Sequence, residues 1–353
     1  MALHTPISQL GEFGLIERIK KIVDIRVDDS TIHDNLIKGI ADDTAIFKPS
    51  LSKLQLFTTD AMVEGIHFDL TYTSLAHLGW KAIVSNISDV AAMCGEPRYA
   101  TVTLCLPQKI SVEMVEEFFR GAVSACKKYS CLIVGGDTTA TVGNMMVSIS
   151  LIGEADPEKV TYRSGAKVGD YICVSGHLGG SHAGLKILLR EKSKYLEGSE
   201  QFSPNLEPYK IAVEKYLLPK PRLDIAKIIS ESIKVNAMID ISDGLASEVY
   251  HICNNSDVGA DIWEHNIPVH TNSQKIAAEF SENVIDYALY GGEEYELLFT
   301  LSDSEYEKLE TLTADITIIG RITDKSNGIN FIRESGEREP LQFNGWDHFK
   351  NYK

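Results

Sequence analysis

Apolar residues recur along the chain with two periods, one typical of helices and one typical of strands. Residues 7–23 place Leu15, Ile19 and Val23 at helical spacing between Glu and Lys side chains, which predicts an amphipathic helix. Short apolar runs predict strands at residues 54–59, 99–106, 131–134 and 145–152, with helices at 74–93 and 112–128. Because strands and helices alternate, the pattern predicts a layered α/β or α+β structure.

A second set of elements follows a turn-rich stretch at residues 154–169. We predict strands at 171–175 and 237–241, helices at 181–190, after Pro221 and at 245–253, and a terminal α/β section that reaches Phe349. The polar residues 191–208 predict a surface excursion. A chain of 353 residues exceeds what one hydrophobic core usually spans, so we predict two domains, residues 1–157 and 158–353.

Charge and composition exclude several classes of protein. With 34 Lys and Arg against 50 Asp and Glu, the net charge of −16 argues against a nucleic-acid partner. The apolar runs are too short to cross a membrane, and the first residues lack the pattern of an export signal, so we expect a cytoplasmic protein. The six cysteines form no C-x-x-C pair and lie among apolar residues, which predicts reduced, buried thiols.

Acidic residues beside Gly, Ser or Thr follow several strand-like runs or lie on an adjoining helix. The five clusters contain Asp42 and Asp43, Asp60 after Thr58 and Thr59, Asp89, Asp137 after Gly135 and Gly136, and Asp240 and Asp243 around Ser242. Acids at strand ends can converge in space, where they would repel one another unless cations lay between them. Oxygen ligands without a His or Cys cluster suit Mg²⁺, the usual companion of phosphates, so the pattern predicts a magnesium-nucleotide site.

Each cluster also has a plainer interpretation. Asp beside Gly or Thr is an ordinary turn or helix-capping residue, and for any single cluster that explanation is the stronger one. Lys81, Ser85 and Asp89 share one face of the predicted helix, which a solvated face also explains. Gly135 and Gly136 either let backbone N–H groups approach a phosphate or form a tight structural turn.

The familiar motifs of other enzyme classes are missing from the sequence. There is no G-x-x-x-x-G-K-[ST] loop, no H-R-D or D-F-G, and no G-x-S-x-G nucleophile elbow. Phosphoryl transfer would therefore need another scaffold.

Taken in order, the motifs resemble the thiamine-monophosphate kinase family, within the superfamily of aminoimidazole-ribonucleotide synthetase. The resemblance runs through nearly the whole chain, from Gly11-Glu-Phe-Gly-Leu-Ile to Gly345-Trp-Asp-His-Phe349. Between these ends it includes Thr58-Thr59-Asp60, Asn86-Ile-Ser-Asp89, Gly135-Gly136-Asp137, Arg163-Ser-Gly, Ile241-Ser-Asp-Gly-Leu245 and Gly291-Gly-Glu-Glu-Tyr-Glu-Leu297. One departure is Ala41, where the family usually has Gly.

The resemblance implies a fold and an activity. The fold is an N-terminal α/β domain that dimerises through its sheet, followed by a C-terminal α+β domain that closes the active-site cleft. The activity is transfer of the γ-phosphoryl group of ATP to thiamine monophosphate, with several Mg²⁺ ions. A selenophosphate synthetase or a hydrogenase-maturation protein would need a characteristic Cys that this sequence lacks. An aminoimidazole-ribonucleotide synthetase-like enzyme and a non-catalytic Mg-nucleotide-binding module remain the alternatives.

The same resemblance implies a role for each matching residue. The Mg²⁺ ligands would be Asp43, Thr58, Thr59, Asp60, Asp89, Asp137, Asp240 and Asp243. Gly136, Asp137, Arg163 and Ser242 would contact ATP, and His67, Glu293 and Trp346 would contact thiamine phosphate. Asp89 and Arg163 would be the catalytic residues of a direct in-line transfer without a phospho-enzyme.

Overall fold

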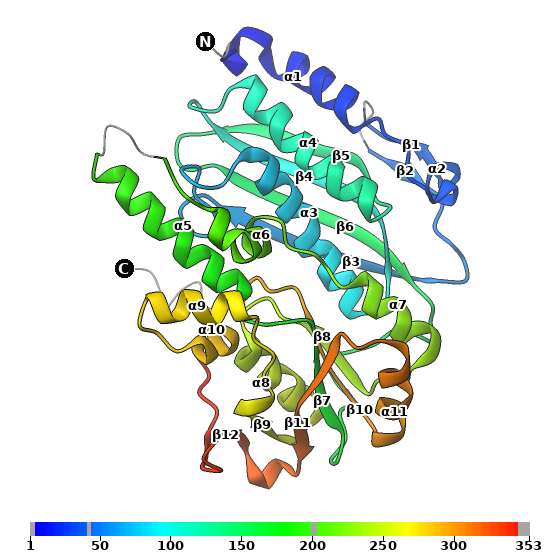
Figure 1. Ribbon diagram of the computed structural model, residues 1–353. Coiled ribbons are helices and arrows are strands. Elements are labelled where there is room, and N and C mark those ends of the chain that lie inside the picture. The colour runs from blue at the N-terminus through cyan, green and yellow to red at the C-terminus, as the bar shows by residue number, and fades with distance from the viewer. Residues whose placement is uncertain (1–3, 41–43, 199–202, 345–353) are drawn as a thin grey trace. The chain divides into compact units, whose positions relative to one another are not determined.

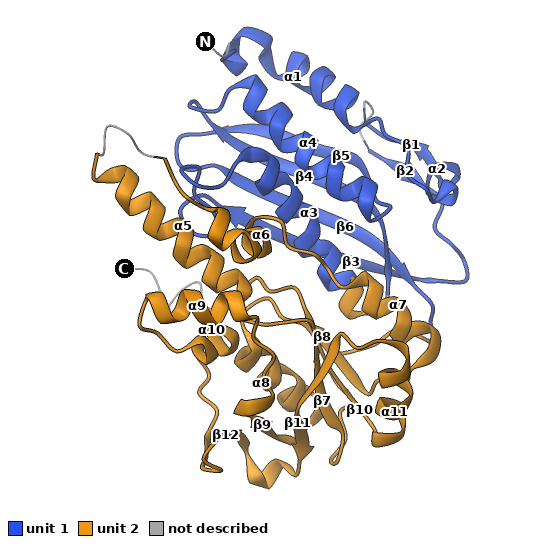
Figure 2. Ribbon diagram, in the orientation of Figure 1, with its two compact units in different colours: residues 1–90, 95–158 blue, residues 91–94, 159–353 orange. Residues whose placement is uncertain are grey.

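The computed structural model describes residues 4–40, 44–198 and 203–344. The chain divides into two compact units, one made of residues 1–90 and 95–158 and the other of residues 91–94 and 159–353 (Figure 2). Both combine helices with a β-sheet, which confirms the predicted mixed α/β architecture (Figure 1).

The first unit is built on a four-stranded sheet in the order β3-β6-β4-β5. The strands are β3 (Leu54–Val63), β4 (Glu96–Pro107), β5 (Leu132–Thr141) and β6 (Met146–Ala155). β6 pairs antiparallel with both β3 and β4, whereas β4 and β5 are parallel and are joined through the helix α4 (Val112–Lys128). The parallel pair requires such a crossover connection, because a tight turn would leave the second strand antiparallel to the first.

The two faces of this sheet differ in burial. Val147, Ile149 and Leu151 of β6 are buried, while the residues between them are partly exposed. The buried face meets α3 (Leu75–Ala92), since the Thr58 hydroxyl donates to the Asp89 carboxylate of that helix. The opposite face carries Phe57, which is 70% exposed. Alternation along each strand therefore separates a helix-covered face from an open one.

An N-terminal segment packs along the edge of this unit. It contains α1 (Ile7–Val23), α2 (Ser30–Asn35), β1 (Leu36–Lys38) and β2 (Ile46–Phe47). Inside α1, Gly11 has a non-helical backbone with φ of 69°, so the predicted helix forms with a kink. α1 buries Leu15, Ile19 and Val23, three of the residues at helical spacing in the sequence.

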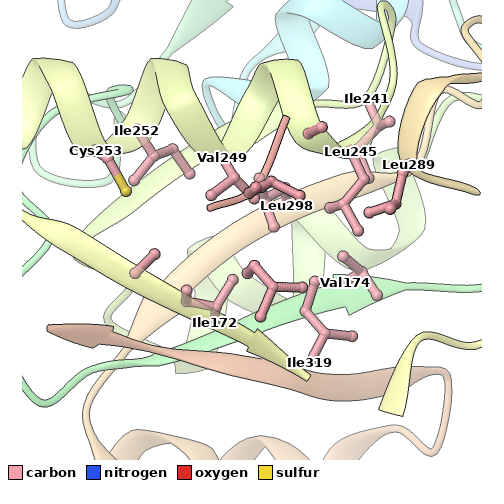
Figure 3. Close-up of a cluster of buried hydrophobic side chains, with 14 of the residues drawn as sticks. Ile172, Val174, Ile241, Leu245, Val249, Ile252, Cys253, Leu289, Leu298 and Ile319 are labelled. Atoms are coloured by element: carbon pink, nitrogen blue, oxygen red, sulfur yellow. The ribbon is translucent and has the colours of Figure 1, made fainter. Parts of the chain in front are cut away.

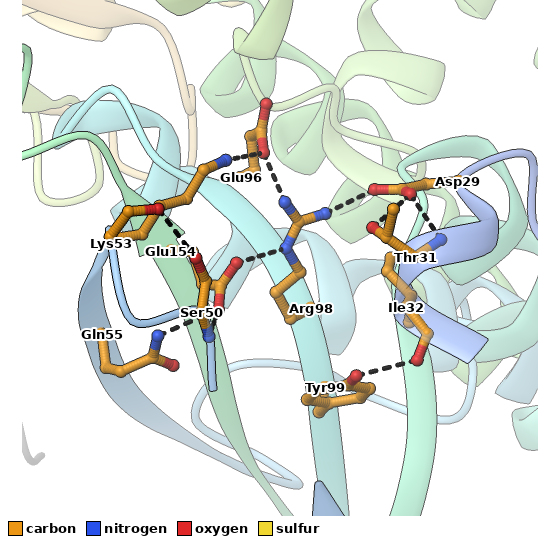
Figure 4. A network of polar contacts seen from close by, with 11 residues as sticks. Asp29, Thr31, Ile32, Ser50, Lys53, Gln55, Glu96, Arg98, Tyr99 and Glu154 are labelled. Carbon is orange, nitrogen blue, oxygen red and sulfur yellow. Dashed lines mark hydrogen bonds and ion pairs between the residues drawn. The ribbon is translucent and has the colours of Figure 1, made fainter. Parts of the chain in front are cut away.

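Arg98 on β4 lies at the centre of a polar network that ties this segment to the sheet (Figure 4). Its guanidinium donates to Asp29 at 2.6 Å, to Glu96 at 2.5 Å and to Glu154 at 3.1 Å. The Glu154 carboxylate, on β6, also accepts from the backbone N–H of Ser50. Because Arg98 and Glu154 are both buried, each charge depends on the other for compensation.

The second unit contains a seven-stranded sheet in the order β13-β12-β9-β11-β7-β10-β8. Its strands are β7 (Tyr171–Ser175), β8 (Ala237–Asp240), β9 (Gly259–Trp263), β10 (Leu297–Leu301), β11 (Ile316–Thr323), β12 (Ile329–Ile332) and β13 (Arg338–Pro340). All neighbouring pairs are antiparallel except β12 and β9. The unit is thus an α+β domain, as predicted.

Two hydrophobic clusters lie against this sheet. The first packs Ile172, Val174 and Leu298 against α8 (Leu245–Ser256) and α10 (Val284–Tyr290) (Figure 3). The second contains the alternate residues Cys173 and Phe299, with α7 (Leu223–Ser232) and α11 (Asp303–Leu312). Successive side chains of β7 and β10 therefore point into the two clusters in turn. Because both faces of these strands are buried, their sequences are continuous apolar runs.

Among the described residues the unit has three further α-helices, α5 (Gly180–Leu196), α6 (Lys210–Leu217) and α9 (Thr271–Glu279), and short 3-10 helices at Glu207–Tyr209, Glu264–Asn266 and Lys325–Asn327. α5 extends beyond the predicted residues 181–190 into the stretch expected to be a surface excursion. The physical reason is Glu191, which is buried and forms ion pairs with Arg190 and Lys194 on the same helix. Polar composition alone hid this helical continuation.

The cysteines and the helix lengths bear on two of the predictions from composition. All six cysteines are free, and Cys126, Cys131, Cys173 and Cys253 are buried, as predicted. Within the described residues, none of the helices combines the length and the apolar character that spanning a membrane requires.

We predict that Arg98→Met lowers the free energy of unfolding by about 3 kcal/mol, because the buried Glu154 carboxylate loses its compensating charge. Urea denaturation followed by circular dichroism measures the change. Lys53→Met is the matched control, since Lys53 contacts Glu96 at the exposed rim of the same network. A loss for Arg98→Met no larger than that of the control would contradict the assignment.

Candidate active site

In the second unit, two segments that carry predicted site residues lie side by side. β8 ends at Asp240 and continues as residues 241–244, while residues 291–296 lead into β10, whose Leu297 pairs with Asp240. The N–H of Glu293 donates to the carbonyl of Ser242 at 2.7 Å. The N–H of Tyr295 donates to the carbonyl of Ile241 at 2.8 Å. These bonds bring the predicted residues Ser242 and Glu293 together.

The second of these segments has an unusual backbone. Glu293 has φ of 62° and Tyr295 has φ of 53°, both in the left-handed region of backbone conformation that residues other than Gly rarely adopt. A Cβ on Gly292 would lie 2.6 Å from the Ser242 carbonyl, so the close approach of the two segments requires glycine there. Residues held in such conformations cluster at functional sites.

Carboxylates gather where the first of these segments meets α8. Burial raises the pKa of Glu248 to about 8, helped by the negative charges of Asp240 and Asp243 and opposed by Arg163. Glu248 also accepts a hydrogen bond from the N–H of Asp243 at 3.1 Å. Arg163 and the pair Asp240 and Asp243, predicted from different motifs, are thus each within electrostatic reach of Glu248.

In the first unit, the structure brings Thr58 and Asp89 together. The Thr58 hydroxyl donates to an Asp89 carboxylate oxygen at 2.5 Å. Asp60 lies two residues along β3 and therefore on the same, helix-covered face. Lys81 and Ser85, which share the Asp89 face of α3, are buried rather than solvated.

Thr59 and Asp137 lie on the other face of that sheet. The Thr59 hydroxyl donates to the Ile149 carbonyl and accepts from the Ser150 hydroxyl. Asp137 is exposed on β5, in register with Thr103 of β4. The structure therefore separates Thr59 and Asp137 from Thr58, Asp60 and Asp89, although Thr59 stands between Thr58 and Asp60 in sequence.

Gly136 lies inside strand β5 rather than in a turn that follows it. A Cβ there would lie 2.0 Å from the Val102 carbonyl of β4, so close strand packing alone requires glycine. The alternative interpretation as a tight structural turn is wrong, because β5 continues to Thr141. A nucleotide contact by Gly136 or Asp137 stays a prediction.

His67 follows β3 in a tight turn. Its ring nitrogen Nδ1 accepts a hydrogen bond from the backbone N–H of Val63 at 3.0 Å. In the neutral ring the proton is then on Nε2, which becomes a hydrogen-bond donor. A donor of this kind suits an anionic group such as a phosphate.

The predicted metal ligands provide oxygen donors, which fit hard divalent cations such as Mg²⁺. Across residues 4–40, 44–198 and 203–344, no three His, Cys, Asp or Glu side chains form a group that could hold a metal ion by themselves. Asp43, Trp346 and the departing residue Ala41 lie outside the described residues. The full set of metal ligands therefore stays a prediction.

Glu248 is a residue of this site that the sequence analysis did not select. It is 2% exposed, and it follows Leu245 on the same helix face as Val249 and Ile252. An acidic residue on the apolar face of a predicted helix was the signal that could have identified it, because burying a lone carboxylate is costly.

Comparison with known proteins shows the class of protein to which this chain belongs. The model of the AIR synthase related protein N-terminal domain matches residues 41–155, and that of the C-terminal domain matches residues 167–332. These matches define an AIR synthase related protein with both domains.

Among its relatives, the thiamine-monophosphate kinase of Aquifex aeolicus is 37% identical, over 97% of this chain and 99% of the relative. That of Bacillus subtilis is 33% identical, over 97% of this chain and 100% of the relative. A solved structure of AaThiL complexed with AMPPCP and TMP is 35% identical, covers 99% of each chain and has a TM-score of 0.74. The chain belongs to the thiamine-monophosphate kinase family.

We predict that Glu248→Gln stabilises the protein increasingly as pH rises. The raised pKa means that the unfolded chain loses this proton near the ordinary glutamate pKa of 4.5, whereas the folded protein holds it until about pH 8. Ionisation of Glu248 therefore lowers the free energy of unfolding progressively between pH 4.5 and about pH 8, and it costs almost nothing below pH 4.5. Gln retains an oxygen that can accept from Asp243.

The expected gain is on the order of 2–4 kcal/mol at pH 8 and under about 1 kcal/mol at pH 5, from urea unfolding without added divalent cations. Glu191→Gln is the control, because the pKa of Glu191 is lowered: burial, which would raise it, is outweighed by Lys194 and Arg190. A gain independent of pH would contradict the assigned pKa.

Proposed function

We propose that this protein transfers the γ-phosphoryl group of ATP to thiamine monophosphate, producing thiamine diphosphate and ADP with the help of Mg²⁺. The observation that carries the proposal is the match over 99% of each chain to AaThiL, whose solved complex contains AMPPCP, an ATP analogue, and TMP. Support comes from the second unit, where Ser242 and Glu293 are joined by a backbone hydrogen bond. A cytoplasmic location stays a prediction.

The proposed roles follow the resemblance residue by residue. The first unit, with the predicted boundary at residue 157, would bind Mg-ATP through Asp60 and Asp89, and the resemblance also assigns Asp137, which lies on the opposite face of the sheet. The second unit would add Asp240, Ser242 and Asp243. The remaining proposed ligands are Asp43, Thr58 and Thr59. Gly136 would contact the nucleotide and Trp346 the thiamine phosphate.

The mechanism we propose is a direct in-line transfer. The acceptor phosphate is already a nucleophile, so the reaction needs little help from a base and much help against charge repulsion. Bound Mg²⁺ would supply charge neutralisation on the phosphates. Arg163, which is exposed at the start of the second unit, would add a fixed positive charge. His67 would orient the acceptor through Nε2–H, and Glu293 would contact the thiamine part.

The organisation we propose is a homodimer formed through the open face of the four-stranded sheet. That face carries Phe57, 70% exposed, beside the partly exposed Ile152 with which it pairs. Thr59, Ser150 and Thr101 extend the same face across three strands. A large aromatic residue on an open sheet face is typical of an interface.

We predict that the purified protein converts thiamine monophosphate to thiamine diphosphate when supplied with Mg-ATP, and that Asp89→Asn lowers turnover about 100-fold or more. Chromatography of the products measures both. The fold should survive, because an Asn oxygen can still accept from Thr58. Asp303→Asn is the control, since Asp303 is an exposed partner of Arg321 far along the sequence from every proposed ligand.

Each alternative has its own signature in this assay. ATP binding by isothermal titration without thiamine diphosphate would favour a non-catalytic module. Turnover only with an aminoimidazole-ribonucleotide synthetase substrate would favour that enzyme class. Near-normal turnover of Asp89→Asn would refute its catalytic role.

We predict that Phe57→Asp converts the dimer to a monomer, because a desolvated carboxylate on each subunit would oppose association. Sedimentation velocity at micromolar concentration measures the change. Leu189→Asp, an exposed position on α5, should leave the dimer intact. A wild-type protein that sediments as a monomer would overturn the proposed interface.

A further inference from the structure

A buried ion-pair network in the second unit includes two side chains of residues 291–296. It consists of Glu294, Glu296, Lys215 and Arg222, with Ser175 and Ser181 at its edges. Glu294 is 0% exposed and Glu296 is 5% exposed, so both side chains point into the unit. The two preceding residues, Gly292 and Glu293, are partly exposed. None of the six residues of the network belongs to the sites proposed above.

Glu294 is held by the start of helix α5. Its Oε1 accepts from the backbone N–H of Ser181 at 2.9 Å. The helix dipole and the free N–H groups of a helix start favour a negative charge. The start of α5 therefore binds an internal carboxylate.

Lys215 connects the two glutamates, and Arg222 adds a second cation to Glu296. Lys215 Nζ lies 3.7 Å from Glu294 Oε2 and donates to Glu296. Arg222 donates to Glu296 Oε2 at 2.6 Å, which also accepts from the Ser175 hydroxyl at 2.6 Å. These cations, outweighing the effect of burial, hold the pKa of Glu296 below its usual value.

The network is costly for stability alone. Burial raises the pKa of Glu294 to about 7 in spite of Lys215. Within the described residues, Glu294 Oε2 and the Ser181 hydroxyl have no hydrogen-bond partner. Apolar residues of similar size commonly replace a buried ion pair without loss of stability. A site that accepts this cost is typical of one that needs a defined geometry.

The residue that needs a defined geometry is Glu293. Its left-handed φ of 62°, like that of Tyr295, is strained and persists only if the surroundings impose it. Two backbone hydrogen bonds constrain the outer side of this segment, through Ser242 and Ile241. On the inner side, the constraint is the pair of buried glutamates that flank Tyr295.

We propose that Glu294 and its ion-pair partner Lys215 are positioning residues, which hold residues 291–296 in the conformation that presents Glu293 to the phosphoryl acceptor. The proposal deepens the proposed function and rests on it for the identity of the acceptor. Neither residue needs to touch substrate. The network acts through the backbone, because Glu294 adjoins Glu293 in the chain.

The first test needs no substrate. Glu294→Gln keeps the size of the side chain and an oxygen for Ser181, but it turns an amide donor or a neutral oxygen toward the Lys215 ammonium. We expect the peptide covering residues 291–296 to exchange its amide hydrogens about tenfold faster by mass spectrometry. Lys215→Met should do the same, and Lys215→Arg should restore slow exchange by keeping the cation.

The second test separates positioning from general destabilisation. In Glu294→Gln and Lys215→Met, we expect the KM for thiamine monophosphate to rise about tenfold, while the KM for ATP and kcat change less than about threefold. Glu191→Gln is the matched control, because Glu191 is a buried, ion-paired glutamate of the same unit that lies on α5. It should leave exchange of residues 291–296 and both KM values unchanged.

The outcomes separate the two proposals. Unchanged exchange of residues 291–296 in both Glu294→Gln and Lys215→Met overturns the positioning role, as does a parallel rise in both KM values. A wild-type protein that makes no thiamine diphosphate refutes the proposed function, yet the exchange experiment still decides whether the network holds the segment. Faster exchange confined to residues 291–296 and reversed by Lys215→Arg supports the proposal.

Discussion

The site in the second unit depends on the backbone pairing of two segments that are about fifty residues apart in the chain. The amide of Ile241 donates to the carbonyl of Glu296, and the amides of Tyr295 and Glu293 donate back to Ile241 and Ser242. This ladder continues the pairing of β8 with β10 beyond the end of the strands. It imposes the left-handed backbone at Glu293, and so it determines which side chains face outward and which are buried.

Buried charge is the recurring cost of this arrangement. Glu248 and Glu294 both have pKa values raised by burial, and both accept hydrogen bonds from backbone N–H groups. Glu248 thereby constrains the segment that carries Asp243, whereas Glu294 ties its own segment, residues 291–296, to the start of α5. The partners differ: Glu294 meets the cation of Lys215, whereas Glu248 lies near the like charges of Asp240 and Asp243. A site that gathers anionic oxygens in this way is suited to cations and to substrates that bring cations with them.

In the first unit the same principle works through strand alternation. Thr58 and Thr59 are neighbours in sequence, yet one bonds Asp89 on the helix-covered face and the other bonds the backbone of β6 and the Ser150 hydroxyl. A single motif in β3 therefore serves both faces of the sheet. Gly136 shows the limit of motif reasoning, because contact with the Val102 carbonyl accounts for the glycine without any ligand.

Elements whose cause is local could be predicted from the sequence. The spacing of Leu15, Ile19 and Val23 was enough for α1, and apolar runs were enough for most strands and for the mixed α/β class. Ordered motifs were enough for the family. Two features depend on residues far apart in the chain and needed the tertiary structure: the burial of Glu248, and the network of Glu294 with Lys215. The physical reason is that periodicity records which residues avoid water, whereas the pairing of buried charges depends on contacts between segments far apart in the chain.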